Sequence, residues 1–418
     1  MSGEATARSD RGEATAPSRP RAAEAPPLRT AVLGAGWVSR TVWVPLLEAH
    51  PAFEVTALVD ADAAAARALA PPGRGVAVGT GPDDLGDLPL DLAVVALPNH
   101  LHVPAARTLL GRGIPVFVEK PVCRTTAEAR ALAEAAGSGA DVYAGSAARH
   151  RADVRALAAL LPSLGDLRAL GLDWTRASGI PQRGGWFTDR RLAGGGALLD
   201  LGWHLLDVGL DLLGRPGVTA ALGAVSSDWL GDSGATADWS PRGRDGATGA
   251  RTADDPVEDT ARGFLLTDTG VAVSLEARWA SHREVDSTTL TVEGTKGVAV
   301  LRGTFGFSPH RVPRSSLTLL RRGERSEIPL PDEPVGIEYE RLVDSLARRL
   351  ASPAGAAPVA PGGSLAEIAV LASCVDRLYA SAGRPGPSPV SPEGQESPQA
   401  PQAPQAPDTT GSQARSGP

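Results

Sequence analysis

Cysteine is scarce in this chain of 418 residues, and this scarcity excludes two classes of protein. The two cysteines, Cys123 and Cys374, lie far apart and form no CxxC motif. A disulfide-stabilised scaffold and a cysteine-rich zinc site are therefore excluded, and we expect no metal centre. The expected location is a reducing compartment, the cytoplasm.

Long apolar runs and an excess of positive charge are missing as well. The longest apolar runs, such as residues 90–97, fall far short of the ~20 residues that a membrane helix needs. Residues 1–28 lack the apolar segment of a signal peptide. The net charge is -7 and aromatic residues make up 4% of the chain, so neither a membrane nor a nucleic acid is an expected partner. A small neutral or polar ligand fits this composition better.

Lysine is almost absent, because only Lys120 and Lys296 appear among the 41 basic residues. An ammonium group can give up a proton at modest cost, whereas a guanidinium group cannot. A lysine kept in an arginine-biased chain is therefore a candidate for proton-transfer chemistry. The alternative is that these lysines have no special role and reflect only random drift in an arginine-rich composition.

Both ends of the chain have compositions that are typical of disorder. Residues 1–28 are rich in Ala, Arg, Glu, Ser and Pro, and residues 383–418 contain the repeat PQAPQAPQAP. The length of the remaining part suits two domains.

Residues 29–147 alternate short apolar runs with alanine-rich segments. This pattern predicts a doubly wound α/β domain with a parallel sheet. Thr125 and Glu128 form a capping box for a helix that ends near Ala136. The expected strands are residues 29–34, 54–59, 92–97, 115–119 and 141–145.

Residues 148–382 have a different pattern, because strand now follows strand. This predicts an α+β domain with a largely antiparallel or mixed sheet. The polar stretch 226–256 is interpreted as an inserted loop, either a functional lid or a disordered segment. Helices are expected at residues 151–161 and 337–350 and from 364 onward, and strands within 166–176, 217–226, 260–280, 287–302 and 315–330.

A glycine-rich loop, LGAGWVS, follows the first expected strand and leads into an expected helix. Gly34 would allow the tight turn, and Gly36 would let the backbone approach a pyrophosphate at the helix N-terminus. Ser39 stands where a third glycine is usual, which weakens the match. The context favours a dinucleotide site over an ordinary turn.

Asp60 closes the second expected strand, where a carboxylate can accept hydrogen bonds from an adenosine ribose. NAD is therefore favoured over NADP, because a 2′-phosphate would meet Asp60 and Asp62 as like charges. Arg40 could offset that repulsion, so NADP remains an alternative.

Three further strings are LPNHLH at 97–102, VEKP at 118–121 and GGGALLDLGWHLLD at 194–207. Their order and spacing resemble the Gfo/Idh/MocA family, the glucose-fructose oxidoreductase and inositol dehydrogenase relatives. The resemblance covers about residues 29–382, and VEDTA at 257–261 also fits it. It implies a Rossmann-type first domain that binds NAD and a second domain that binds substrate. It further implies assembly into a homodimer or homotetramer.

Lys120, Asp200 and His204 are the candidate catalytic residues. Lys120 leaves a strand at the carboxyl edge of the expected parallel sheet, where its ammonium could contact the reacting oxygen of a ligand. Asp200 and His204 lie four residues apart in a predicted helix, so they share one face. We expect His204 to titrate near neutrality and transfer protons, and Asp200 to orient a substrate hydroxyl or tune the imidazole. A core histidine beside a surface aspartate is the alternative.

The resemblance implies further contacts. Besides Gly34, Gly36 and Asp60, the implied cofactor-binding residues are Trp37, Val38, Leu97, Pro98, Asn99, His102 and Glu119. The implied substrate contacts are Arg149 and Trp186, with a solvated charge and a core indole as the respective alternatives. Glu119 could also hold Lys120 in place. Cys123 is interpreted as a small packed residue rather than a reactive thiol.

The sequence thus predicts an NAD-dependent oxidoreductase that moves a hydride between nicotinamide and a secondary alcohol carbon of a sugar, cyclitol or derivative. In relatives that reduce 3-keto nucleotide sugars, a tyrosine commonly takes the place of the histidine, so His204 favours the sugar and cyclitol dehydrogenases. A nucleotide-sugar ketoreductase and a non-catalytic dinucleotide-binding regulator are the alternatives. A regulator would be expected to lose the lysine or the histidine.

Overall fold

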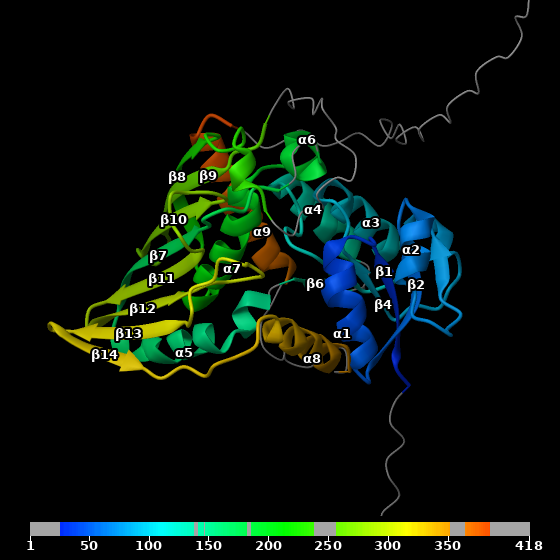
Figure 1. The fold of residues 1–418 in the computed structure, drawn as a ribbon, viewed down its shortest axis with the longest axis horizontal. Helices are drawn as coiled ribbons and strands as arrows, with labels where there is room; N and C mark the ends of the chain where they lie inside the picture. The colour runs from blue at the N-terminus through cyan, green and yellow to red at the C-terminus, as the bar shows by residue number, and fades with distance from the viewer. Residues whose placement is uncertain are drawn as a thin grey trace, which may run out of the picture.

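The structure, a computed structural model, describes residues 26–137, 141–145, 147–181, 185–237, 256–351 and 364–384. Residues 1–25 and 385–418, which make up most of the two ends predicted to be disordered, and most of the 226–256 loop lie outside these ranges, whereas Leu28 begins the first strand. The described residues form two β-sheets with helices packed on them (Figure 1).

The first sheet has six parallel strands in the order β3-β2-β1-β4-β5-β6. They are β1 (Leu28–Leu33), β2 (Phe53–Val59), β3 (Ala77–Gly79), β4 (Leu92–Val95), β5 (Val116–Val118) and β6 (Val142–Ala144). This order is that of a doubly wound Rossmann-type sheet and confirms the predicted fold of the first domain. β3 is absent from the predicted strands because it has only three residues, too few for a clear strand pattern.

Helices cover both faces of this sheet. α1 (Val44–Ala49) and α2 (Ala63–Leu69) pack on one face, and α3 (Asn99–Gly111) and α4 (Thr126–Ala136) pack on the other. α1 continues a π-helical segment, Ser39–Trp43, that begins just after the glycine loop. Thr125 caps α4 as predicted, because its hydroxyl accepts a hydrogen bond from Glu128 N at 3.2 Å.

The second sheet has eight strands in the order β14-β13-β12-β11-β7-β10-β9-β8. They are β7 (Leu167–Thr175), β8 (Val218–Ser226), β9 (Thr260–Thr267), β10 (Ala272–Arg278), β11 (Ser287–Gly294), β12 (Gly297–Gly303), β13 (Ser316–Arg321) and β14 (Glu324–Ile328). β7 and β10 pair in parallel and the other described neighbours are antiparallel, which confirms the predicted mixed sheet. The predicted strand segments 260–280, 287–302 and 315–330 each fold as two antiparallel strands.

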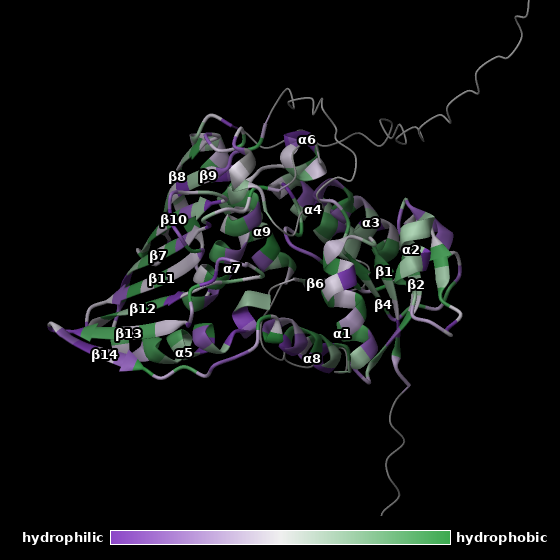
Figure 2. Cartoon of the chain, viewed as in Figure 1, coloured by the Kyte–Doolittle hydropathy of each residue, from purple (hydrophilic) through white to green (hydrophobic). Residues whose placement is uncertain are grey.

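Three helices cover one face of the second sheet: α5 (Ala152–Leu160), α7 (Trp203–Leu212) and α9 (Leu365–Ser381) (Figure 1). The edge strand β14 is hydrophilic, which discourages pairing with a further strand (Figure 2). The short helix α6 (Arg190–Ala193) lies near the start of α3. Among the described residues, none of the helices has the length and apolar character needed to cross a bilayer.

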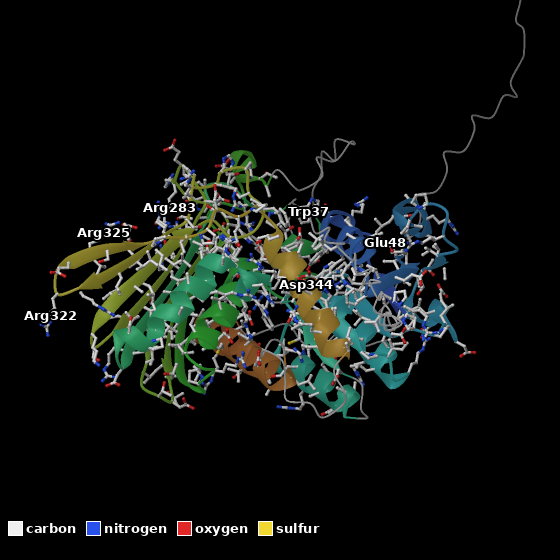
Figure 3. The ribbon with its side chains drawn as sticks, turned by 90° about the horizontal axis from the view of Figure 1, so that it is seen from below. Trp37, Glu48, Arg283, Arg322, Arg325 and Asp344 are labelled. Carbon is white, nitrogen blue, oxygen red and sulfur yellow. The ribbon has the colours of Figure 1, made fainter. Side chains whose placement is uncertain are left out.

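α8 (Ile337–Ala351) follows the second sheet in sequence but packs on the first domain. Its residues Leu342, Val343 and Leu346 share a core with α1, and Asp344 Oδ1 lies 3.1 Å from His50 Nε2 (Figure 3 labels Asp344). The part of the chain predicted as the second domain therefore contributes a helix to the core of the first.

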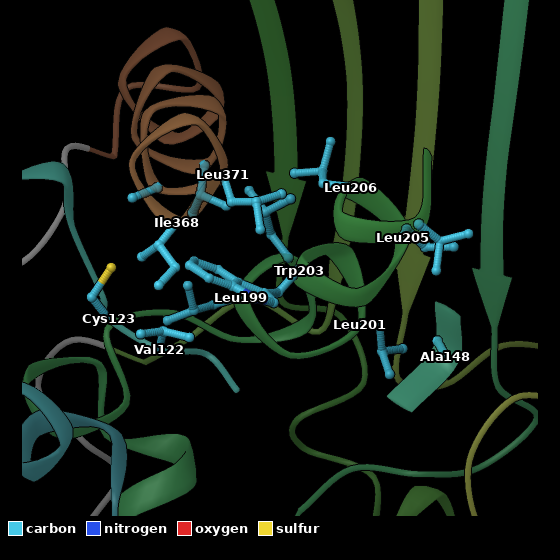
Figure 4. Close-up of a cluster of buried hydrophobic side chains, with 14 of the residues drawn as sticks. Val122, Cys123, Ala148, Leu199, Leu201, Trp203, Leu205, Leu206, Ile368 and Leu371 are labelled. Atoms are coloured by element: carbon cyan, nitrogen blue, oxygen red, sulfur yellow. The ribbon is translucent and has the colours of Figure 1, made fainter. Parts of the chain in front are cut away.

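One hydrophobic core joins the two domains. Cys123, which lies between β5 and β6 of the first domain, is in a cluster with Leu199, Trp203 and Ile368 (Figure 4). Its side chain is fully buried, and burial raises the pKa of the thiol well above its usual range. The interpretation of Cys123 as a packed residue is confirmed.

Candidate active site

Three loops meet at the carboxyl edge of the first sheet, after the neighbouring strands β1, β4 and β5. Backbone hydrogen bonds join them: Ala96 N donates to Leu33 O at 2.8 Å, and Glu119 N donates to Val95 O at 2.9 Å. Open α/β folds bind their ligands at this edge, so these loops carry the candidate site.

The glycine loop has the shape that a dinucleotide needs. Gly34 has a φ of +101°, and a Cβ there would lie 2.3 Å from the carbonyl oxygen of Ala96, so glycine is required. A Cβ on Gly36 would meet nothing within 4 Å, which leaves open space where the helix begins at Trp37. Backbone N–H groups at such a turn can hold a pyrophosphate, so the residues fit NAD. Ser39 is fully buried in the place of the third glycine.

Asp60 lies beside this loop at the end of β2. Its carboxylate accepts hydrogen bonds from Ala35 N at 2.6 Å and Asp62 N at 2.9 Å, which ties the glycine loop to the second strand. A carboxylate has about four lone-pair sites, so acceptor capacity remains for ribose hydroxyls. Asp62 caps α2 by accepting two backbone hydrogen bonds, and Arg40 is exposed.

The polar side-chain atoms of Asn99 and His102 lie close to backbone carbonyls. Asn99 Nδ2 donates to Ala193 O at 2.8 Å. The ring nitrogens of His102 lie 2.6 Å from Leu97 O and 2.8 Å from Pro121 O, and burial lowers the pKa of this imidazole to about 4. These contacts position the loop after β4. Direct contact with the cofactor stays a prediction for Trp37, Val38, Leu97, Pro98, Asn99 and His102.

Lys120 and Asp200 form an ion pair at the centre of the site. Lys120 Nζ lies 2.6 Å from Asp200 Oδ1, and the Trp279 indole donates to Asp200 Oδ2 at 2.9 Å. The Lys120 side chain is 22% exposed and that of Asp200 is 7% exposed, so the ammonium is the more accessible partner. Burial alone would raise the pKa of Asp200, but the charges of Lys120 and Arg176 hold it well below its usual range.

These bonds add a role to those expected for Asp200. Each of its oxygens accepts one hydrogen bond from a protein group, so the carboxylate positions the Lys120 ammonium. Its orientation of a substrate hydroxyl stays a prediction. Asp200 also lies in a π-helical segment, Leu198–Gly202, that leads into α7, where the sequence predicts one regular helix. The fully buried Trp279 is absent from the predicted site, because no motif marks it.

His204 lies on α7 near this ion pair, with its ring 5.6 Å from that of Trp174. Burial, and then the positive charge of Lys120, lower the pKa of His204 to about 3. The prediction that this imidazole titrates near neutrality is therefore wrong. A neutral imidazole has one hydrogen-bond donor and one acceptor to offer.

Glu119 fixes the main chain at Lys120. Its Oε1 accepts a hydrogen bond from the Trp43 indole at 2.8 Å, and its Oε2 accepts one from the backbone N of Lys120 at 2.9 Å. Burial raises the pKa of the Glu119 carboxyl. The prediction that Glu119 holds the lysine is correct only for the backbone, because the ammonium pairs with Asp200.

Arg149 is buried in an ion cluster, which contradicts its prediction as a substrate contact. Its guanidinium pairs with Asp207, with Glu367 at 3.0 Å and with Asp211 at 3.4 Å, and its side chain is 8% exposed. Asp207 and Asp211 lie on α7 and its end, and Glu367 lies on α9. The guanidinium therefore joins two helices of the second domain.

An aromatic group and a second cation surround the ion pair. The Trp186 ring lies 4.4 Å from that of Phe187, which lies 6.2 Å from that of Trp279. This places Trp186 in the aromatic surroundings of the site, and its contact with substrate stays a prediction. Arg176 follows β7, and its guanidinium carbon lies 5.7 Å from the Trp174 ring. Arg176 is absent from the predicted site because arginine is the usual cation of this chain.

Two sequence motifs, GGG and VEDTA, meet behind the ion pair. Glu258 Oε1 accepts hydrogen bonds from Gly196 N at 2.9 Å, Leu198 N at 3.0 Å and the Tyr379 hydroxyl at 2.7 Å. A Cβ on Gly196 would lie 1.8 Å from the carbonyl oxygen of Glu258, so glycine is required. Glu258 thus caps the segment that carries Asp200. In the described ranges, no three His, Cys, Asp or Glu side chains are grouped to hold a metal ion.

Comparison with known proteins defines the class to which the fold and the site belong. Residues 28–144 match the model described as "Oxidoreductase family, NAD-binding Rossmann fold", and residues 155–300 match the "GFO/IDH/MocA C-terminal domain". The chain belongs to the Gfo/Idh/MocA family and is an oxidoreductase with an NAD-binding fold.

Several of its relatives are named as enzymes that act on sugars. The putative UDP-kanosamine synthase oxidoreductase subunit of Amycolatopsis mediterranei (strain S699) is 48% identical over 356 residues, which are 85% of this chain and 96% of that protein. The D-glucoside 3-dehydrogenase of Escherichia coli (strain K12) is 29% identical over 286 residues, 66% of this chain and 77% of that protein. Among solved structures, GenD2 from gentamicin A biosynthesis in complex with NAD has a TM-score of 0.66 at 25% identity, and the match covers 88% of this chain and 97% of that one.

Proposed function

We propose that this protein oxidises a secondary hydroxyl of a glucose-type sugar carried on a nucleoside diphosphate, or reduces the corresponding ketone, with NAD as its cofactor. The relative from A. mediterranei is named for a UDP-linked amino sugar, and the relative from E. coli is named for position 3 of a glucoside. The high identity over nearly the whole of the former supports a UDP-linked substrate. The observation that carries the reaction is the Lys120–Asp200 ion pair at the sheet edge.

The residues of the site support proton transfer at the substrate oxygen. Bound NAD supplies the hydride acceptor. During reduction the Lys120 ammonium donates a proton to the ketone oxygen and becomes a neutral amine, and during oxidation the neutral amine takes the proton of the substrate hydroxyl and becomes the ammonium. Asp200, held by Trp279, positions that nitrogen. The neutral His204 offers a hydrogen bond that orients the substrate.

Specific observations also bear on two alternative functions. Cyclitols or free sugars are the second candidate, because His204 stands where nucleotide-sugar ketoreductases of the family commonly have tyrosine. A non-catalytic regulator has less support, since Lys120 and His204 are both kept and Lys120 pairs with Asp200.

A substrate panel tests the proposed function. NADH formation would be measured with UDP-glucose, methyl glucoside, glucose and myo-inositol, and NADH consumption with the corresponding ketones. We expect kcat/KM for the UDP-linked sugar to exceed that for glucose by at least about tenfold. A preference for myo-inositol would favour the cyclitol candidate. Intact NAD binding without turnover of any compound, in either direction, would favour the regulator.

Cofactor choice is a second expected outcome. Asp60 stands beside the glycine loop, so NAD should bind at least about tenfold more tightly than NADP, a difference of ~1.4 kcal/mol. Fluorescence titration with each dinucleotide would measure the two affinities, and Asp60→Ala should narrow the difference. Equal or reversed affinities in the wild type would contradict the role of Asp60 and implicate Arg40.

The oligomeric state is the third expected outcome. We propose a homodimer or homotetramer in which a second copy of the chain covers the free face of the second sheet. Leu222, Phe264 and Leu266 of β8 and β9 are 66%, 48% and 39% exposed on the face opposite α9. Light scattering at micromolar concentration should give at least about twice the chain mass of 42.8 kDa, and a monomer would contradict the proposal.

We also propose a cytoplasmic location. Cys123 and Cys374 are both buried free thiols, which suits a reducing compartment.

A further inference from the structure

We infer that Arg176 is a substrate-recognition residue that binds a phosphate group attached to the sugar whose hydroxyl reaches Lys120. This inference rests on the proposed function and deepens it, because it assigns a residue to the anionic part of the substrate. Its basis is the position of Arg176, the charges around the ion pair and the hydrogen-bonding capacity that its guanidinium retains.

Arg176 lies in the site because two neighbours hold it there. Its guanidinium carbon is 5.7 Å from the Trp174 ring, and the same ring lies 5.6 Å from that of His204. Its stem packs against Gly179, where an added Cβ would lie 2.4 Å from Arg176 Cδ and 3.1 Å from Trp279 O. Trp279 is the residue whose indole holds Asp200. The side chain of Arg176 is therefore placed between Trp174 and the residues that position the ion pair.

Arg176 adds a positive charge beside the ion pair. Lys120 and Arg176 are both cationic, and Asp200 is the carboxylate on which both charges act. The Asp200 carboxylate is bonded to Lys120 and to Trp279, and the buried Glu119 is bonded to Trp43 and to the backbone of Lys120. Neither carboxylate is therefore bonded to the Arg176 guanidinium, which leaves this cation to meet an anionic group of the substrate.

The guanidinium of Arg176 also keeps donors for a ligand. Among the described residues, its hydrogen bond runs from Nη1 to Gly179 O at 3.4 Å, which is long for such a bond, and no carboxylate lies within ion-pair distance. Arg149 provides the contrast, since it is buried among the carboxylates of α7 and α9. A guanidinium presents its donors as a planar fork that matches the oxygens of a phosphate group. A nucleoside diphosphate and a simple sugar phosphate share this chemistry, and the test below separates them.

The test compares Arg176→Gln with Arg168→Gln. Arg168 lies near the other end of β7, about 25 Å away along the extended strand, and its side chain is 60% exposed. Kinetics would be measured with UDP-glucose, glucose 1-phosphate and the neutral methyl glucoside. For Arg176→Gln, we expect the ratio of kcat/KM for UDP-glucose to that for methyl glucoside to fall by at least about tenfold, mainly through KM. Arg176→Lys should restore part of that ratio, and Arg168→Gln should leave it unchanged.

A binding measurement separates this inference from the proposed function. UDP and glucose 1-phosphate would be titrated calorimetrically into the NAD-loaded wild type and each variant. A loss of affinity for UDP of at least about tenfold in Arg176→Gln would support the inference even if no sugar is turned over, in which case only the proposed function fails. An equal loss for glucose 1-phosphate would assign the contact to a simple sugar phosphate. If the wild type binds neither compound, or if Arg176→Gln binds both as the wild type does, the inference is overturned.

Discussion

Replacing Lys120 by arginine is expected to lower kcat by at least about 100-fold while NAD still binds. Arginine keeps the positive charge beside Asp200, but a guanidinium is broader and does not exchange its proton near neutral pH. The Lys120 nitrogen is held 2.6 Å from Asp200 and its side chain remains 22% exposed, as required of a group that meets the substrate oxygen. The measurement is kcat on a sugar that the wild type oxidises, with NAD affinity determined in parallel.

The chain supplies its own control for this substitution. Lys296 is the other lysine, and it lies exposed in the turn between β11 and β12, in the second domain. Lys296→Arg should keep kcat within about threefold of the wild type. If Lys120→Arg behaved like that control, the amine would not be the proton-handling group of the reaction.

The second large effect concerns stability. Arg149→Met is expected to lower the free energy of unfolding by about 3–5 kcal/mol, because it removes the guanidinium that pairs with the buried carboxylate of Asp207. The carboxylate of Glu367 would keep an ion-pair partner, since Arg215 also pairs with it at 3.0 Å. Urea unfolding would measure the change, with Arg168→Met as the control on an exposed arginine.

The same variant tests whether Arg149 has any role toward substrate. Because its guanidinium joins α7 to α9, the folded fraction of Arg149→Met should bind substrate with a KM within about threefold of the wild type. An unchanged unfolding midpoint together with a large rise in KM would restore the substrate contact that the sequence predicts.

The fold could be predicted where the signals are local. Strands of a parallel sheet are buried on both faces, so apolar runs mark them in the sequence: β4 is LAVV throughout, and β1 and β2 end in AVL and ALV. The position of α8 could not be predicted in the same way. Leu342, Val343 and Leu346 show that one face of this helix is buried, but an apolar face does not specify which domain covers it.

The site could be predicted where a motif encodes its geometry. Gly34, Gly36, Asp60 and Lys120 follow strand ends at the carboxyl edge of the sheet, as their motifs predict. The hydrogen bond from Trp279 to Asp200 could not be predicted in this way, because the two residues lie 79 positions apart in the chain and no motif links them.

The prediction that Arg149 contacts substrate is wrong for a related reason. The sequence next to an arginine does not show which carboxylates will pack around it in the folded protein. Asp207 and Asp211 come from α7 and its end, and Glu367 comes from α9, far along the chain. Only the packing of these helices turns a candidate ligand contact into a buried structural cluster.

The position of α8 limits how this chain could be recombined with its relatives. Its apolar residues fill the core beside Trp43 and Leu47, so a fragment that ended at residue 147 would expose that surface to water. A chimera that takes its nucleotide domain from one parent would therefore have to take α8 from the same parent. The inherited unit is discontinuous, with the whole second sheet lying between its two segments, and a single crossover in the gene would break it.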